Sequence, residues 1–229
     1  MDLTSAPEMI FGIPGQVFLI FVSAFFYIFA VVLFWRQYHR SGDELLSAFL
    51  AFLSGMAVFH LVLGIGSYYK NESLILLGLL AALTGSTFTL KFSLSYFSKQ
   101  WRSWFFYSTL AVVWTIFLVA ILSGVAIPKI LTATLWYMIF STGFLVSFYV
   151  VARGFMSRDR STKIKCVGGG IGMAVCCLAA DATVLFAGIS ILGEALMSLA
   201  PVIIILSVYY GRRVERLADA ASLTKYVSI

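Results

Sequence analysis

The sequence predicts an all-α integral membrane protein, a bundle of seven transmembrane helices. Of its 229 residues, 61% are hydrophobic and 11% are charged, whereas soluble domains average roughly 45–50% apolar and about 25% charged residues. The apolar residues form seven runs, each near the roughly 20 residues that a helix needs to cross a bilayer. Seven such spans with short connections use almost the whole chain, so we expect no separate soluble domain.

The predicted spans follow one another closely along the chain. We expect them at about residues 14–35, 44–67, 73–97, 104–125, 130–151, 166–187 and 191–210. Residues 1–13 would form a short outside segment, and residues 211–229 a cytoplasmic tail that begins as a helical extension of the last span. The first residues contain no basic stretch, so we expect no cleavable signal peptide, and the first span serves as the insertion signal.

The distribution of basic residues predicts the orientation of the bundle. Thirteen of the sixteen lysines and arginines fall in alternate connections and in the tail. They are Arg36, Arg40, Lys99, Arg102, Arg153, Arg158, Arg160, Lys163, Lys165, Arg212, Arg213, Arg216 and Lys225. The opposite connections hold only Lys70 and Lys129, and Lys91 lies within the third span. Because basic residues near span ends stay on the cytoplasmic side, this pattern indicates an outside N-terminus and a cytoplasmic C-terminus in the cell membrane, not a surface for nucleic acid.

Three titratable side chains inside the apolar spans form the candidate site. Asp181 and Glu194 lie in the sixth and seventh spans, and His60 lies in the second. At a rise of 1.5 Å per residue, all three lie roughly 6–11 Å below the outer boundary. Ionisable residues within a bilayer are costly and usually have a partner or a function. If spans two, six and seven are neighbours, the three residues form one ligand- or proton-binding layer. The alternative is that hydroxyls and backbone satisfy each group separately and fix helix register.

Three further residues support this layer. Ser198 and Pro201 lie on the same face of the last span as Glu194. Pro201 would free a backbone carbonyl about one turn earlier and kink the helix. Lys91 lies about six residues from the cytoplasmic end of span three, where it either snorkels to the headgroups or faces the bundle interior.

Small residues on span six predict close helix packing. On a helix, one stripe contains Gly168, Gly172, Cys176 and Ala180, and an adjoining stripe contains Gly170, Ala174, Cys177 and Asp181. Stripes of this kind let neighbouring helices approach closely. The second stripe places Asp181 in the packed interior.

The residue types present exclude several classes of site. His60 is the single intramembrane histidine, so neither bis-histidine haem ligation nor a three-histidine metal site is possible within one chain. The three cysteines show no metal-binding spacing, no GxSxG motif is present, and the last span has no lysine for a retinal Schiff base. We therefore expect no metal, no cofactor and no catalytic residues.

The last two spans and the exit helix carry a family resemblance. It begins at Ser190-Ile191-Leu192-Gly193, continues through Pro201 and ends in Tyr210-Gly211-Arg212-Arg213-Val214-Glu215-Arg216-Leu217. This part, about a fifth of the chain, resembles the N-terminal seven-transmembrane sensory modules of prokaryotic histidine kinases. The resemblance implies a sensor that signals through its exit helix, although we expect no kinase domain in this chain.

Together these observations favour a non-enzymatic sensor or receptor-like protein that binds a small ligand, lipid or proton in its outer half. Its partners would be membrane lipids and a cytoplasmic or membrane protein, contacted through the Arg153–Lys165 loop and the Arg212–Ile229 tail. Two alternatives remain open. One is a small proton-coupled transporter that uses the same carboxylates, and the other is a structural or assembly subunit of a larger membrane complex.

Overall fold

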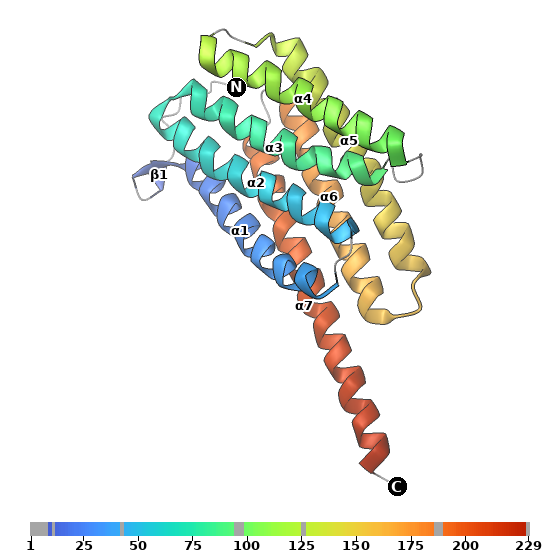
Figure 1. Cartoon of the computed structure of the whole chain (residues 1–229). Helices are drawn as coiled ribbons and strands as arrows, with labels where there is room; N and C mark the ends of the chain where they lie inside the picture. Colours follow the sequence, from blue (N-terminus) through green and yellow to red (C-terminus); the bar gives the residue numbers. More distant parts are fainter. Residues whose placement is uncertain are drawn as a thin grey trace.

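The structure, a computed structural model, describes residues 9–10, 12–41, 44–93, 99–124, 127–185 and 190–227. These residues form a two-residue-per-strand hairpin and seven long helices (Figure 1). The elements are β1 (Met9–Ile10), β2 (Ile13–Pro14), α1 (Gly15–Ser41), α2 (Glu44–Tyr69), α3 (Glu72–Ser93), α4 (Lys99–Ser123), α5 (Lys129–Met156), α6 (Arg160–Leu185) and α7 (Ser190–Val227). The predicted all-α architecture is confirmed, with one helix at each predicted span.

Six of the helices are long and apolar enough to cross a membrane. They are α1, α2, α3, α4, α6 and α7, while the described part of α5 contributes a shorter apolar stretch, Gly143–Met156. Large hydrophobic side chains such as Phe25, Trp104 and Leu145 are more than half exposed on the outer surface. Apolar faces of this extent belong against lipid, so the chain is a multi-pass membrane protein.

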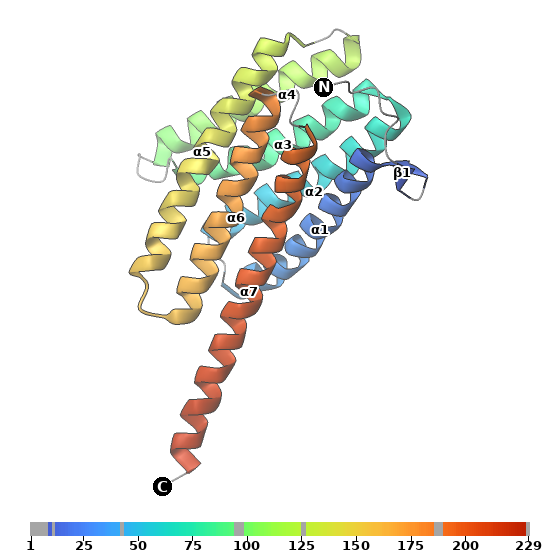
Figure 2. The same cartoon turned by 180° about the vertical axis from the view of Figure 1, so that it is seen from behind.

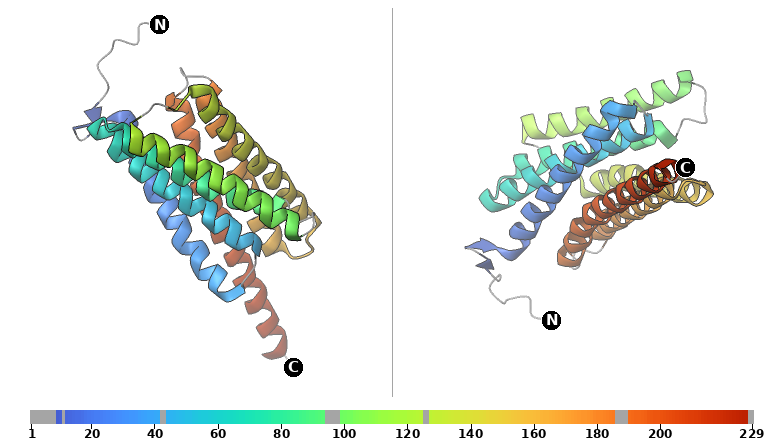
Figure 3. Two further views of the ribbon diagram at one scale, coloured as in Figure 1. Left: turned by 45° about the horizontal axis from the view of Figure 1, so that its top comes forward. Right: turned by 90° about the horizontal axis from the view of Figure 1, so that it is seen from below.

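The helices pack as a closed ring of six with one helix outside it. α1 contacts α2 and α7, α2 contacts α3, α3 contacts α5, and α6 packs between α5 and α7. α4 packs on the outside of α3, away from α6 and α7 (Figure 3). The helices of the ring carry most of the largest fully buried side chains of the described residues, among them Tyr27, Phe52 and Phe140. The second, sixth and seventh predicted spans, which would be neighbours if they share a site, correspond to α2, α6 and α7. In the ring, α6 packs directly on α7, and α2 and α7 both pack on α1.

Glycines set the closest helix contacts. A Cβ atom on Gly168 would overlap the Cβ of Ser207, and one on Gly172 would lie 2.9 Å from the carbonyl oxygen of Ala200. Both contacts are between α6 and α7, so the predicted stripe of small residues is confirmed as a packing face. Gly170 faces α5 instead, where a Cβ would lie 2.9 Å from the Ser147 carbonyl oxygen.

The last helix is much longer than its span. α7 has 38 residues and continues through Pro201 as one helix. Its final turns extend beyond the bundle (Figures 1 and 2). The predicted helical extension after Gly211 is therefore confirmed, and the residues that extend beyond the bundle belong to the same continuous helix as Glu194.

Candidate functional site

Two of the predicted site residues face each other inside the ring. The Nε2 atom of His60 on α2 lies 3.9 Å from Oε2 of Glu194 on α7. His60 is fully buried and Glu194 is 7% exposed. Among the residues that the structure describes, neither of these two atoms has a hydrogen-bond partner. Buried polar atoms are nearly always paired, so this gap marks the pair as unusual.

The ring of His60 is held in a fixed orientation. Its Nδ1 atom lies 2.8 Å from the carbonyl oxygen of Met56, one turn earlier on α2. Tyr27 stacks on one face with centroids 5.0 Å apart, and Phe59 packs edge-on at 4.8 Å. Because a carbonyl oxygen only accepts hydrogen bonds, Nδ1 must carry a hydrogen. A neutral His60 therefore presents the lone pair of Nε2 to Glu194.

Tyr27 connects this pair to the proline of α7. A proline at position 201 cannot donate to the carbonyl of Met197, four residues earlier. The hydroxyl of Tyr27 donates to that carbonyl oxygen at 3.2 Å and also lies 3.1 Å from Sγ of Cys176 on α6. The carbonyl predicted to be freed by Pro201 is thus satisfied by a side chain from α1. The ring of Tyr27 also stacks on His60, so one side chain contacts both the carbonyl that Pro201 leaves free and the His60–Glu194 pair.

Serines tie α1 to the turn of α7 that carries Glu194. The Ser198 hydroxyl donates to the Glu194 carbonyl oxygen at 2.8 Å. The Ser23 hydroxyl on α1 lies 3.0 Å from its own Leu19 carbonyl oxygen and within hydrogen-bond distance of the Ser198 hydroxyl. Because each hydroxyl has one hydrogen and that of Ser198 goes to Glu194, Ser23 is the donor when it bonds to Ser198. The predicted supporting residue Ser198 therefore lies next to the pair, where it fixes the register of α1 against α7.

The remaining predicted residues are placed only in part. The structure describes Asp181 and Lys91 as helical positions on α6 and α3, but their side chains lie outside the described residues. Whether they join the pair stays a prediction. Among the residues that the structure describes, no group of three or more His, Cys, Asp or Glu residues could hold a metal ion.

Sequence reasoning missed Tyr27, the residue that organises the site. The available signal was a tyrosine in the middle of an apolar span, because a buried tyrosine hydroxyl usually has a hydrogen-bond partner. Trp136 on α5 was likewise missed, and its Nε1 donates to the Ala180 carbonyl oxygen at 2.9 Å. Both residues close the ring interior around the pair.

A separate apolar groove lies between α2, α3 and α4. Its volume is about 480 Å³, and its walls include Gly55, Ala81, Gly85 and Trp114. Trp114 Nε1 donates to Oγ1 of Thr84 at 3.1 Å. The groove does not include the His60–Glu194 pair, so the two features are independent.

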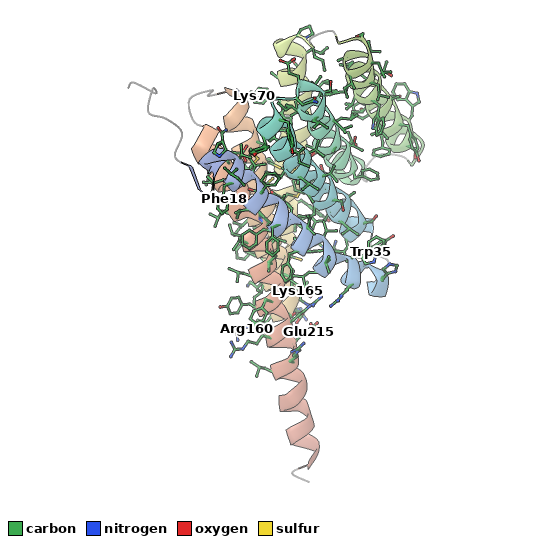
Figure 4. All side chains as sticks on the ribbon, turned by 90° about the vertical axis from the view of Figure 1, so that its left-hand side faces the viewer. Phe18, Trp35, Lys70, Arg160, Lys165 and Glu215 are labelled. Carbon is green, nitrogen blue, oxygen red and sulfur yellow. The ribbon has the colours of Figure 1, made fainter. Side chains whose placement is uncertain are left out.

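The basic end of the bundle is closed by polar contacts between α6 and α7. Ser161 donates to the Gly211 carbonyl oxygen at 2.9 Å, and Lys165 Nζ lies 3.0 Å from Oε2 of Glu215. Figure 4 shows Arg160, Lys165 and Glu215 together where α7 leaves the bundle, with Lys70 at the opposite end. The basic segment with Arg160 and Lys165 and the connection with Lys70, which were expected on different sides of the membrane, therefore lie at opposite ends of the bundle.

Asp159 caps the first turn of α6. Its carboxylate accepts hydrogen bonds from the backbone N–H groups of Ser161 at 3.2 Å and Thr162 at 2.7 Å. The hydrogen bonds from the Thr162 side chain and backbone hold the pKa of Asp159 below its usual value. This cap fixes the start of α6 at Arg160. The segment expected as the Arg153–Lys165 loop therefore consists of the last turn of α5, a connection at residues 157–159 and the first turns of α6.

The fold and the site define a helical multi-pass membrane protein with a buried histidine–carboxylate pair. Comparisons of the chain with protein-family models, with curated proteins and with solved structures find no match.

Proposed function

We propose that this chain is a non-enzymatic, seven-span membrane sensor, and that its sensing element is the His60–Glu194 pair. Of the small ligand, lipid and proton considered from the sequence, the geometry favours the proton. The single observation that carries this proposal is the 3.9 Å separation of two buried atoms that lack hydrogen-bond partners among the described residues.

A proton is the ligand that this pair requires. With Nδ1 of His60 donating to Met56, Nε2 and an ionised Glu194 would both be acceptors. Two acceptors cannot hydrogen-bond to each other, whereas one added proton on either group creates a charge-assisted or neutral hydrogen bond between them. A small approach of α2 and α7 would close the gap. Protonation is thereby coupled to helix position.

α7 supports a route from the pair to the basic end. Glu194 lies near the start of α7, and the same helix continues for 38 residues to the extension beyond the bundle. A shift or rotation at Glu194 would reach Gly211 and Glu215, which contact α6. In this proposal, a separate protein binds the extension of α7 and the Arg153–Lys165 segment, and it responds to the movement of α7.

The proposed orientation has the N-terminus outside and the C-terminus in the cytoplasm, with α5 as the seventh span. Most basic residues occur at the end of the bundle with Arg160 and Lys165, and Lys70 lies at the other end (Figure 4). The positive-inside rule places the first of these ends in the cytoplasm. The pair would then sense the pH of the outer side.

Hydrogen-exchange mass spectrometry of the protein in lipid nanodiscs tests this function. Wild type and Glu194→Gln are compared with each other at the same pH, over a series of pH values. We expect wild type to show a pH-dependent change in protection along residues 205–217 of α7, and we expect Glu194→Gln to lack that change. The control Glu72→Gln removes an exposed carboxylate from the first turn of α3 and should respond like wild type. An identical response in Glu194→Gln would contradict the proposal.

The same pair also suits a proton-coupled carrier, because an interior histidine–carboxylate pair is a site that a moving proton can occupy. Counter-ion flux in proteoliposomes separates the two functions. A sensor shows no substrate-linked proton flux above empty liposomes, whereas a carrier shows flux that Glu194→Gln abolishes.

A further inference from the structure

Two basic segments that are distant in the sequence meet at one end of the bundle. Residues 153–165, which cover the last turn of α5, the connection and the first turns of α6, contain five basic residues and one acidic residue. Residues 211–216 of α7 contain three basic residues and one acidic residue. We propose that these segments form one binding surface for the anionic headgroups of phospholipids in the adjacent leaflet. This inference does not depend on the proton-sensing function.

Specific contacts bring the two segments together. The Ser161 hydroxyl donates to the carbonyl oxygen of Gly211, and Lys165 pairs with Glu215 at 3.0 Å. A Cβ on Gly211 would lie 2.5 Å from Cγ of Lys165, so the helices touch at this point. Arg160 and Arg212 each adjoin a member of the Ser161–Gly211 contact. Their charges are therefore held on neighbouring turns of α6 and α7.

The acidic residues of this surface are already engaged. Asp159 caps α6 through the backbone of Ser161 and Thr162, and Glu215 pairs with Lys165. Lys165–Glu215 is the ion pair that the structure shows between described side chains at this end of the bundle. Arg153, Arg158, Arg160, Arg213 and Arg216 are exposed. Together the two segments contain eight basic and two acidic residues, and this excess of positive charge is complementary to phosphate groups.

The depth of the surface favours lipid headgroups over a soluble anion. Tyr209 and Tyr210, one turn before Arg213, are 61% and 52% exposed. Phe155, 61% exposed, lies between Arg153 and Arg158, and Nζ of Lys163 lies 5.5 Å from its ring centroid. Exposed tyrosines at a span end mark the level of the headgroups. Arginines immediately beyond that level reach lipid phosphates, and each contributes about 1 kcal/mol to binding an anionic membrane.

The positive-inside rule alone requires basic residues in the connections, without any spatial arrangement. The structure adds that the basic residues of two segments distant in the sequence lie together where α6 contacts α7. A converged surface binds one anionic headgroup with several arginines, and dispersed charges would bind headgroups weakly and independently. The test therefore compares charge removal inside this surface with equal charge removal outside it.

Native mass spectrometry of the purified protein in micelles, titrated with phosphatidylglycerol or phosphatidylcholine, measures the binding. The test variant is Arg160→Gln/Arg213→Gln. The control, Arg36→Gln/Lys70→Gln, removes the same net charge from exposed positions on α1 and in the α2–α3 turn. We expect wild type to prefer phosphatidylglycerol, the test variant to lose about five-fold in affinity per arginine, and the control to bind like wild type.

Two outcomes would overturn the proposal. One is equal binding of both lipids by wild type, and the other is an equal loss in test and control variants. Retention of an acidic protein partner with no lipid preference would assign the surface to that partner instead. If the glutamine variant does not fold, Arg160→Lys/Arg213→Lys and the salt dependence of wild type decide. Binding must then be retained by the lysine variant and must weaken as ionic strength rises.

Discussion

At the scale of single residues, the interior of the ring contains few polar side chains, and they differ in whether each has a hydrogen-bond partner. Most hydroxyls return a hydrogen bond to their own helix, as Thr84 does to the Leu80 carbonyl oxygen at 2.7 Å. Such bonds make serine and threonine inexpensive in a span. His60 and Glu194, like the Ser86 hydroxyl, each leave one buried atom without a hydrogen bond among the described residues. The pair differs in that its two unbonded atoms lie 3.9 Å from each other.

The depth of the pair could be predicted from the sequence, and its partnership could not. Counting residues from the outer boundary places His60 and Glu194 at similar levels, since every residue of a helix adds the same rise. Rotation of each helix about its axis decides whether the two side chains face each other, and an almost uniformly apolar span carries little rotational information. Tyr27 was missed for the same reason.

Tyr27→Phe tests the hydrogen bond from Tyr27 to the Met197 carbonyl oxygen, which has no backbone donor because residue 201 is a proline. The ring, fully buried, keeps its stacking on His60, but the Met197 carbonyl loses its donor. An unsatisfied buried acceptor costs about 1–3 kcal/mol, so we expect a loss of that size in the free energy of unfolding in mixed micelles. Tyr68→Phe, at an exposed position, should leave stability nearly unchanged. Equal stability of Tyr27→Phe and wild type would show that this hydrogen bond is absent.

At the scale of elements, small residues determine which helices touch. Gly55 on α2 and Gly85 on α3 allow backbone contact, since a Cβ on Gly55 would lie 2.8 Å from the Gly85 Cα. The small-residue stripe of α6 was visible in the sequence as a four-residue repeat, and the structure confirms that Gly168 and Gly172 of this stripe pack against α7. The partner helix was not predictable, because the repeat specifies a face and not what packs on it.

Two adjacent glycines of α6 provide a matched test of this packing. A Cβ on Gly168 would overlap the Cβ of Ser207, whereas a Cβ on Gly169 would meet nothing within 4 Å. We expect Gly168→Ala to destabilise the bundle by about 1–3 kcal/mol through overpacking. Gly169→Ala should be neutral or stabilising by roughly 0.5–1 kcal/mol, because alanine favours the helix. Unfolding in mixed micelles measures both, and the reverse order would contradict the α6–α7 contact.

At the scale of the whole molecule, the bundle is a ring of six helices with α4 packed outside on α3. The approximate limits of the seven long helices that the structure describes followed from hydropathy, because span length is set by bilayer thickness. The position of α4 did not follow, since a helix that faces lipid on most sides has the same composition as one in a ring. The closure of α1 against α7 places α2 and α7 close enough for His60 to reach Glu194.

The most direct measurement of the central claim is pH-difference infrared spectroscopy of the protein in lipid, with attention to the carboxylic acid C=O stretch. The claim is that a proton binds between Glu194 and His60. We expect wild type to show a pH-dependent carboxylic acid band that is absent in Glu194→Gln, shifted in His60→Gln and unchanged in Glu72→Gln. A spectrum in which Glu194→Gln keeps every pH-dependent band of wild type would contradict the account.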